Sequence, residues 1–365
     1  MKSRLERYRW KVENVLREQH FVVGKRERGL IGERTANGRR YFYMVADRRE
    51  GKRIVERFIK IPENNTKKLL LPFRRQIEVA KYLKQKRIIN TRGVIAYNCD
   101  PKRGTPFAVM ETFPTGHAKI GFIEDNQGVE RLGRREAERI IIQLKRFHDV
   151  SVRMLPSGLK KVLKKNPGNY DSFRREILRN LSKKVRPLDH RKSSEPLYRV
   201  FERRLEINDL KEKTKELLND CGPIIDTNAN RKISLVHGDM APNNLYIFDS
   251  GDVEFLDLEW VGTFKNSAIA IIIDYGNLRA RSWKNSKFRK LLDEALIRAY
   301  RKEGKEVLGK AIVRLSILRS HMLLSGFFEN YDYPKQKKPV QSRRRKETER
   351  DIAEAFSLLS QSKVA

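Results

Sequence analysis

The sequence predicts an α+β fold with two lobes, in which a small antiparallel sheet comes first and a mostly helical part follows. Strand-forming stretches separated by turn signals, including the dipeptide Asn37-Gly38, are concentrated between residues 21 and 61. From residue 134 onward, apolar residues instead recur at helical spacing. With 365 residues, the chain is long enough to build two separate cores.

The first lobe is expected over residues 1–112. A charged amphipathic helix is expected over residues 1–20 and another helix over residues 69–85, because apolar residues recur there at helical spacing. Strands are predicted at residues 21–23, 30–35, 40–46, 53–61 and 105–112, with a turn at residues 47–51. Short turns between consecutive strands predict antiparallel pairing.

The second lobe is expected over residues 113–333. Apolar spacing predicts helices over residues 134–150, 267–278, 288–302 and 306–328. Residues 151–232 form a basic, helix-prone region with predicted breaks at Pro156, Pro167-Gly168, Pro187 and Gly222-Pro223. Residues 334–365 are expected to be a basic linker and a short amphipathic helix, for which a solvated cap is favoured over a tether to nucleic acid or membrane.

The net charge is strongly positive. The chain carries 80 Lys and Arg against 46 Asp and Glu, a formal charge of +34. Such a field attracts nucleotides and other anions and repels cations. It also allows contact with nucleic acid, but the basic residues are spread along the chain, which favours a basic bias over solvated helix faces instead.

The cysteines and the apolar runs indicate the cellular setting. Cys99 and Cys221 are far apart and lack CxxC spacing, which predicts neither a disulfide framework nor a zinc site. A reducing, cytoplasmic setting is the default for such a chain. Because the longest apolar run covers only residues 268–273, we expect no signal peptide and no membrane span.

Polar residues gather at both ends of a predicted hairpin. Apolar residues 245–248 and 253–256 flank the turn-rich residues 249–252. Asp239 and Asn244 come before the first strand, and Asp257 comes directly after the second, so the hairpin should bring these three side chains close together. Phosphoryl transfer from a nucleotide needs a carboxylate that orients the attacking hydroxyl and oxygen ligands for magnesium, which this set supplies.

At these residues the chain resembles the aminoglycoside/choline phosphotransferase branch of the protein-kinase-like fold. The carrying motifs are His237-Gly238-Asp239, Asn244 five residues later, and Asp257-Leu258-Glu259. The resemblance implies transfer of the γ-phosphoryl of ATP or GTP, with Mg²⁺, to a hydroxyl of a sugar, an amino alcohol or an aminoglycoside-like molecule. It also implies that Asp239 is the catalytic base, that Asn244 and Asp257 bind magnesium, and that Glu259 is a second carboxylate at or behind the metal.

The same resemblance implies roles for other residues around the nucleotide. Lys60 would contact the phosphates, with either Gln76 or Glu78 as its partner on the following helix; helical spacing favours Gln76 and charge favours Glu78. The turn with Asn37 and Gly38 is a weak candidate for the loop over the phosphates. The backbone of Met110, Glu111 and Thr112 would contact adenine. His237 and Asp274 would support the catalytic loop, Asp274 by bracing its backbone.

Two other functions are weighed against this one. An atypical protein kinase would carry a recognisable activation segment after Asp257, and none ending in Ala-Pro-Glu is present. A basic, RNA-associated pseudokinase would keep the fold without turnover, but Asp239, Asn244 and Asp257 are all present. A small-molecule kinase is therefore the favoured interpretation.

Overall fold

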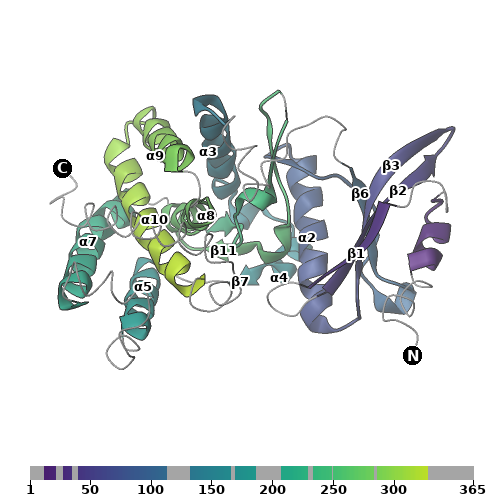
Figure 1. Cartoon of the computed structure of the whole chain (residues 1–365), viewed down its shortest axis with the longest axis horizontal. Coiled ribbons are helices and arrows are strands. Elements are labelled where there is room, and N and C mark those ends of the chain that lie inside the picture. Colours follow the sequence, from purple (N-terminus) through teal and green to yellow (C-terminus); the bar gives the residue numbers. More distant parts are fainter. Residues whose placement is uncertain are drawn as a thin grey trace, which may run out of the picture. The chain divides into compact units, whose positions relative to one another are not determined.

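A computed structural model describes residues 12–21, 28–34, 40–112, 132–165, 169–185, 207–228, 233–248, 250–282 and 286–327. The chain divides into two compact units. Unit 1 comprises Met1–His117, Leu155–Leu163 and Glu254–Val261, and unit 2 comprises Ala118–Met154, Lys164–Val253 and Gly262–Ala365. Unit 1 carries a small antiparallel sheet and unit 2 is mostly helical, which confirms the predicted α+β fold (Figure 1).

The sheet of unit 1 has five strands in the order β1-β2-β3-β6-β5. They are β1 (Arg28–Arg34), β2 (Arg40–Glu50), β3 (Arg53–Pro62), β5 (Val94–Asn98) and β6 (Phe107–Glu111), and all neighbours are antiparallel. The predicted turn at residues 47–51 is wrong, because β2 continues to Glu50 and only residues 51 and 52 turn. Cross-strand pairing extends the hairpin, and an ion pair between Arg57 and Glu50 at 2.6 Å supports the extension.

Helices cover both faces of this sheet. Helix α2 (Lys67–Gln85) lies on one face, where Phe73 and Ile77 pack against Tyr41 and Met110. The short helix at residues 12–18 packs its apolar side against the other face, toward Phe42 and Met44. Figure 1 shows the two helices on opposite sides of the strands. Since neighbouring residues of β2 point to opposite faces, the alternation Tyr41, Phe42, Tyr43, Met44 serves both cores.

Several short elements complete unit 1. Strand β10 (Val253–Phe255) pairs in parallel with β4 (Asn90–Thr91) through Glu254 and Phe255. The 3₁₀ helix η6 (Leu258–Trp260) follows β10, and α4 (Ser157–Val162) belongs to the same unit. A second 3₁₀ turn, η1 (Pro101–Arg103), connects β5 to β6.

Helix α8 (Ser267–Arg281) lies at the centre of unit 2. Residues 268–272 of this helix are all buried. The other helices are α3 (Arg134–His148), α5 (Tyr170–Val185), α7 (Ile207–Asn228), α9 (Ser286–Arg301), α10 (Glu306–Phe327) and the 3₁₀ turn η4 (Val152–Met154). A small sheet is formed by β7 (Lys164–Lys165), β11 (Gly262–Phe264) and β8 (Ser234–Val236). These helices confirm the ones predicted from apolar spacing to within a few residues.

The predicted break at Gly222-Pro223 is wrong, because α7 continues through both residues. Buried side chains on either side of the proline, such as Leu218, Cys221 and Ile225, hold the helix by packing. The missing side chain of Gly222 leaves room for the ring of Tyr170 on α5, which would lie 2.9 Å from a Cβ atom. Tertiary packing therefore outweighs the local preference of proline to end a helix.

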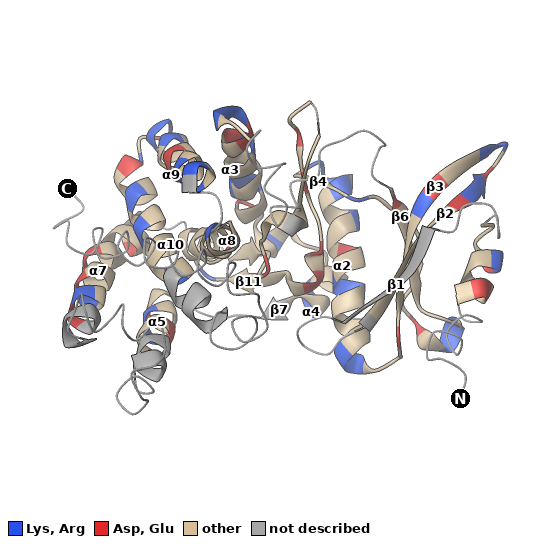
Figure 2. Ribbon diagram, in the orientation of Figure 1, with Lys and Arg blue, Asp and Glu red and all other residues tan. Residues whose placement is uncertain are grey.

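The charge is spread over both units. Figure 2 shows Lys and Arg on the helices of unit 2 as well as on α2 and the β2-β3 hairpin. Cys99 and Cys221 are both unpaired thiols. None of the described helices combines the length and the apolar character that crossing a membrane requires.

Candidate active site

Lys60 on β3 is one of the deeply buried site residues of unit 1, with only 2% exposure. Its Nζ donates a 2.7 Å hydrogen bond to Oε1 of Gln76 and forms an ion pair with Glu259. The ammonium also lies 4.1 Å from the centre of the Tyr41 ring, where the negative face of the ring attracts it. Burial opposes the charged form, but the neighbouring Glu259 carboxylate raises the pKa of Lys60 well above its ordinary value.

The partner of Lys60 on α2 is Gln76. Glu78, the other candidate, is partly buried and lies in the electrostatic surroundings of Lys81 and Cys99 instead. The two residues project from the helix about 200° apart, so only one of them can face the strand lysine. The carboxylate beside Lys60 therefore comes from Glu259 after β10 and not from α2.

The turn after β10 presents two carboxylates in different surroundings. Asp257 adopts the left-handed conformation, with φ 51° and ψ 61°, which is uncommon for a residue other than glycine. Its side chain is 39% exposed and its Oδ1 lies 3.9 Å from Nζ of Lys60. The Glu259 side chain is only 3% exposed. The Glu259 carboxylate is therefore buried in its ion pair with Lys60, and the Asp257 carboxylate is the more accessible of the two to a ligand.

The end of strand β6 is held from several sides within unit 1. The Glu111 N–H donates to the Gly93 carbonyl at 3.0 Å, and the Glu111 carbonyl accepts from Nη1 of Arg92 at 3.2 Å. The hydroxyl of Thr112 donates to the Glu56 carbonyl at 2.9 Å, and Met110 is 4% exposed. The predicted contact of these backbone groups with adenine remains a prediction. Asn37 and Gly38 lie outside the described residues.

In unit 2, helix α8 holds the loop that follows β8. The fully buried Asp274 accepts the N–H groups of His237 at 2.6 Å and Gly238 at 2.8 Å. Asn277, one turn later, donates to the Gly238 carbonyl at 3.3 Å. Gly238 has φ 81°, a backbone conformation that suits glycine. Burial raises the pKa of Asp274 to about 6, although the two N–H groups act in the opposite direction.

The same loop orients Asn244 and Asp239. The 3₁₀ turn η5 (Pro242–Asn244) leads into β9 (Leu245–Ile247) and buries Asn244 to 6% exposure. Its Nδ2 donates to the Asp239 carbonyl at 2.7 Å, so its Oδ1 is the atom that can accept a cation. The Asp239 N–H lies 3.4 Å from Nδ1 of His237, which is completely buried.

These donors fit magnesium in kind. Mg²⁺ prefers carboxylate, amide and water oxygens, and it is commonly held by one or two carboxylates together with nucleotide phosphates. Asn244 in unit 2 and Asp257 in unit 1 each offer such an oxygen. Among the described residues, no three His, Cys, Asp or Glu side chains gather into a metal-binding cluster.

The structure thus places the predicted site residues in two groups. Lys60, Gln76, Asp257 and Glu259 lie together in unit 1, with Lys60 at the centre. His237, Asp239 and Asn244 lie in unit 2 along one loop, and Asp274 on α8 holds that loop. The predicted approach of Asp239 to Asp257 remains a prediction. The predicted hairpin turn is present, because the Phe248 N–H donates to the Asp252 carbonyl at 2.9 Å.

Two further residues support these groups. Arg75, adjacent to Gln76, is 6% exposed and was not singled out by sequence reasoning. The available signal was that Pro72 and Val79 share its helix face at i−3 and i+4. His148 at the end of α3 is fully buried, and its Nδ1 lies 2.7 Å from the Leu235 carbonyl. Burial lowers the pKa of His148 to about 4.

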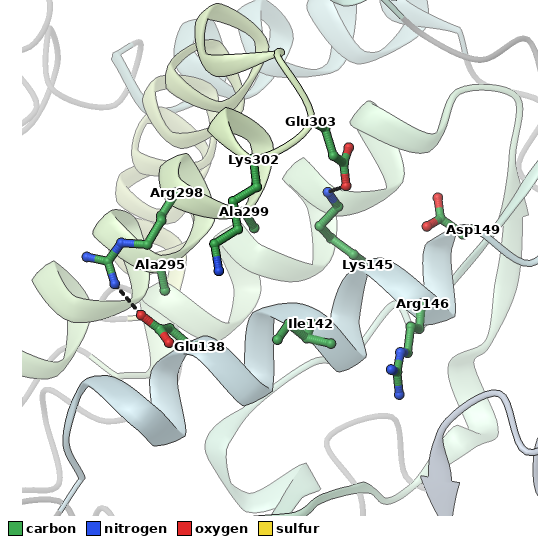
Figure 3. A pocket seen from close by; sticks show the side chains of 10 residues that line it. All are labelled: Glu138, Ile142, Lys145, Arg146, Asp149, Ala295, Arg298, Ala299, Lys302 and Glu303. Atoms are coloured by element: carbon green, nitrogen blue, oxygen red, sulfur yellow. Dashed lines mark hydrogen bonds and ion pairs between the residues drawn. The ribbon is translucent and has the colours of Figure 1, made fainter.

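A groove on unit 2 lies apart from these residues. A cavity of about 290 Å³ opens between α3 and α9, with Ile142 on one wall and Ala295 and Ala299 on the other (Figure 3). Two ion pairs cross it. Arg298 of α9 pairs with Glu138 of α3, and Lys145 of α3 pairs with Glu303 in the turn after α9. None of the predicted site residues is among those that line it.

The comparisons with known proteins concern the fold. The sequence matches no protein-family model and no curated protein. Among solved structures, the GDP complex of a mutant aminoglycoside 2'-phosphotransferase-IIIa is similar, with a TM-score of 0.52 at 12% identity over 97% of this chain and 99% of that one. An aminoglycoside phosphotransferase from Alicyclobacillus acidocaldarius is similar with a TM-score of 0.50 at 10% identity, covering 95% of this chain and 94% of that one. The chain therefore has the protein-kinase-like fold of these two phosphotransferases.

Proposed function

We propose that this chain transfers the γ-phosphoryl group of ATP or GTP to a hydroxyl group of a small molecule, with the help of magnesium. The observation that carries this proposal is the buried ammonium of Lys60, held by Gln76 and Glu259 and lying 3.9 Å from the exposed carboxylate of Asp257. A fixed ammonium can contact the phosphate groups of a nucleotide, and an accessible carboxylate beside it can bind the metal ion that accompanies them.

The residues of unit 1 serve the nucleotide. Lys60 contacts the phosphates as a point charge, and the contacts with Gln76 and Glu259 hold its ammonium in place before the nucleotide arrives. Asp257 would contribute an oxygen to magnesium, and Asn244 is the magnesium ligand predicted in unit 2. When bound, magnesium neutralises the charge on the phosphates. Glu259 acts mainly by keeping Lys60 charged and placed, since its own side chain is buried.

The loop in unit 2 serves the acceptor. Asp239 orients the acceptor hydroxyl and receives its proton while the hydroxyl oxygen forms a bond to the γ-phosphorus and the bond to the leaving diphosphate oxygen breaks. Asp274 holds the backbone before Asp239 through the N–H groups of His237 and Gly238. A reducing, cytoplasmic setting fits two unpaired cysteines and is part of this proposal.

The acceptor class is narrowed by charge. A field of +34 disfavours the approach of a polycation, so a sugar, an amino alcohol or an anionic metabolite ranks ahead of an aminoglycoside. The two similar structures are aminoglycoside phosphotransferases, and one of them was determined with GDP. Aminoglycosides and GTP therefore belong among the compounds to be tested.

The test is magnesium-dependent nucleotide turnover against pools of hydroxyl metabolites and aminoglycosides, with ATP and GTP assayed separately. Turnover stimulated by one pool is expected from the wild type. The turnover rate should fall by several orders of magnitude in Asp239→Ala, with nucleotide affinity nearly unchanged. Asp257→Ala should lower the turnover rate and also weaken the apparent affinity for Mg²⁺. Asp220→Ala, at an exposed position on α7, is the matched control. Equal activity in Asp239→Ala and the control would remove Asp239 from the role of base.

A further inference from the structure

Arg75 on α2 makes contacts that no sequence motif indicates. Its guanidinium is buried and donates two 2.6 Å hydrogen bonds in different directions. Nε donates to the carbonyl of Val162, the last residue of α4, and Nη1 donates to the carbonyl of Glu259 in η6. A guanidinium suits this position because its rigid planar fork can reach two separate acceptors at once.

The contact with Glu259 matters because Glu259 is then fixed at both ends. Its carboxylate is paired with Lys60 on β3, and its backbone carbonyl accepts from Arg75 on α2. Asp257 lies only two residues earlier and has the left-handed backbone conformation. A non-glycine residue keeps the left-handed conformation only where its surroundings enforce it. Glu259, which is fixed two residues after Asp257, can supply that constraint.

Helix α2 therefore contacts both parts of the proposed nucleotide site in unit 1. Gln76 accepts from the ammonium of Lys60, and the preceding residue, Arg75, holds the segment that carries Asp257. We propose that Arg75 is a positioning residue, which keeps residues 257–260 in the conformation that binds magnesium and couples that conformation to α2. The magnesium part of this inference rests on the proposed function; the ordering of the segment does not.

The first test reads the segment directly by amide hydrogen exchange on the full chain without nucleotide. In Arg75→Met the amides of residues 258–261 should exchange at least about tenfold faster than in the wild type, because the hold on the Glu259 carbonyl is lost. Arg74→Met is the matched control, since Arg74 is the exposed neighbour on the same helix. Unchanged exchange in a folded Arg75→Met protein would overturn the proposal.

A conservative variant covers the case in which Arg75→Met does not fold. Arg75→Lys keeps the positive charge but cannot reach both carbonyls with a planar fork, so exchange at residues 258–261 should rise to an intermediate extent. If Arg75→Lys exchanges like the wild type, the charge alone is sufficient and the proposed role of the guanidinium is wrong.

The second test separates metal binding from nucleotide binding. ADP is the probe, titrated without metal and then with Mg²⁺, with binding followed by calorimetry. Arg75→Met should weaken the apparent Mg²⁺ affinity by about tenfold while metal-free ADP affinity stays within about twofold of the wild type, a split that general destabilisation would not produce. Equal Mg²⁺ affinity in both proteins would overturn the metal part. If the wild type binds no ADP, the proposed function fails, and the exchange experiment still decides the role of Arg75.

Discussion

At the scale of single residues, the pairing of Lys60 with Glu259 has a measurable effect on stability. Both side chains are 3% exposed, so removing one partner leaves a charge in a poorly solvated place. Glu259→Gln is therefore expected to lower the free energy of unfolding by about 2–4 kcal/mol, measured by urea denaturation. Asp257→Asn, whose side chain is 39% exposed, should cost less than about 1 kcal/mol and serves as the control.

The double variant Lys60→Met with Glu259→Leu distinguishes stability from function. Replacing a buried ion pair by apolar side chains is often neutral, so this protein should regain most of the stability lost in Glu259→Gln. It should nevertheless lose nucleotide binding, because no cation remains to contact the phosphates. If the double variant were as unstable as Glu259→Gln, the pair would contribute to the free energy of unfolding through side-chain packing more than through charge.

A second effect at this scale concerns pH. Burial raises the pKa of Asp274 from 3.8 to about 6 and lowers the pKa of His148 from 6.5 to about 4. The folded protein therefore holds the Asp274 proton more tightly than the unfolded chain, and this contribution to stability is lost as pH rises through about 6. The folded protein holds a proton on His148 less tightly, and that contribution is lost as pH falls from 6.5 toward 4.

These two contributions oppose each other over nearly the same range of pH, so removing one should expose the other. In Asp274→Asn the free energy of unfolding should fall more steeply than in the wild type as pH drops from about 6.5 to about 4. Urea denaturation at several pH values measures both curves. Parallel curves for the two proteins would mean that Asp274 titrates normally in the folded state.

At this scale the sequence identified residues that lie in recognisable motifs, and it missed a residue whose contacts are made by the folded chain. Lys60, Asp239 and Asp257 stand in recognisable patterns. For the partner of Lys60, helical spacing favoured Gln76 and charge favoured Glu78, so the sequence left that choice open. Arg75 was missed because an arginine among charged neighbours normally faces water, and its burial depends on the carbonyls of Val162 and Glu259, which are distant in sequence.

At the scale of elements, the close packing of α9 and α10 depends on Gly309. A Cβ atom there would lie 2.9 Å from Cβ of Tyr300 and 3.3 Å from the backbone Cα of Ile297, which cannot move without shifting α9. Gly309→Ala should therefore lower the free energy of unfolding by about 1–2 kcal/mol, because overpacking exceeds the gain of up to about 1 kcal/mol in helix propensity. Thermal or urea denaturation measures the change.

The matched substitution is Gly158→Ala in α4. A Cβ atom at Gly158 would meet no atom within 4 Å, so alanine there should leave stability unchanged or raise it slightly. If Gly309→Ala were as stable as Gly158→Ala, the two helices would have to separate without loss of packing, and the close approach would not be a constraint.

The elements that sequence patterns predicted well are those with a strong local signal. Helices α3, α8, α9 and α10 follow from the spacing of their apolar residues, and the hairpin turn before β10 follows from its turn residues. The errors occurred where tertiary contacts outweigh local preference. Strand β2 continues past its expected turn because it pairs with β3. Helix α7 passes through Pro223 because side chains before and after the proline are buried.

At the scale of the whole molecule, composition limits function through the electric field. The formal charge of +34 is spread over both units, so it acts at long range on any charged ligand before specific contacts form (Figure 2). The field attracts a nucleoside triphosphate and repels a polycation. Both effects weaken with added salt, because the Debye length falls from about 10 Å at 0.1 M to about 3 Å at 1 M.

Salt therefore separates the acceptor classes. Between about 0.05 and about 0.5 M KCl the KM for the nucleotide should rise several-fold, and the KM for an anionic acceptor should rise with it. The KM for an uncharged sugar should change little, and that sugar is the control for general effects of salt on the enzyme. An aminoglycoside acceptor should instead show a falling KM, since screening relieves its repulsion. A rising KM for an aminoglycoside would mean that its pocket is locally acidic and outweighs the field of the whole chain, and the ranking of acceptors by net charge would then be wrong.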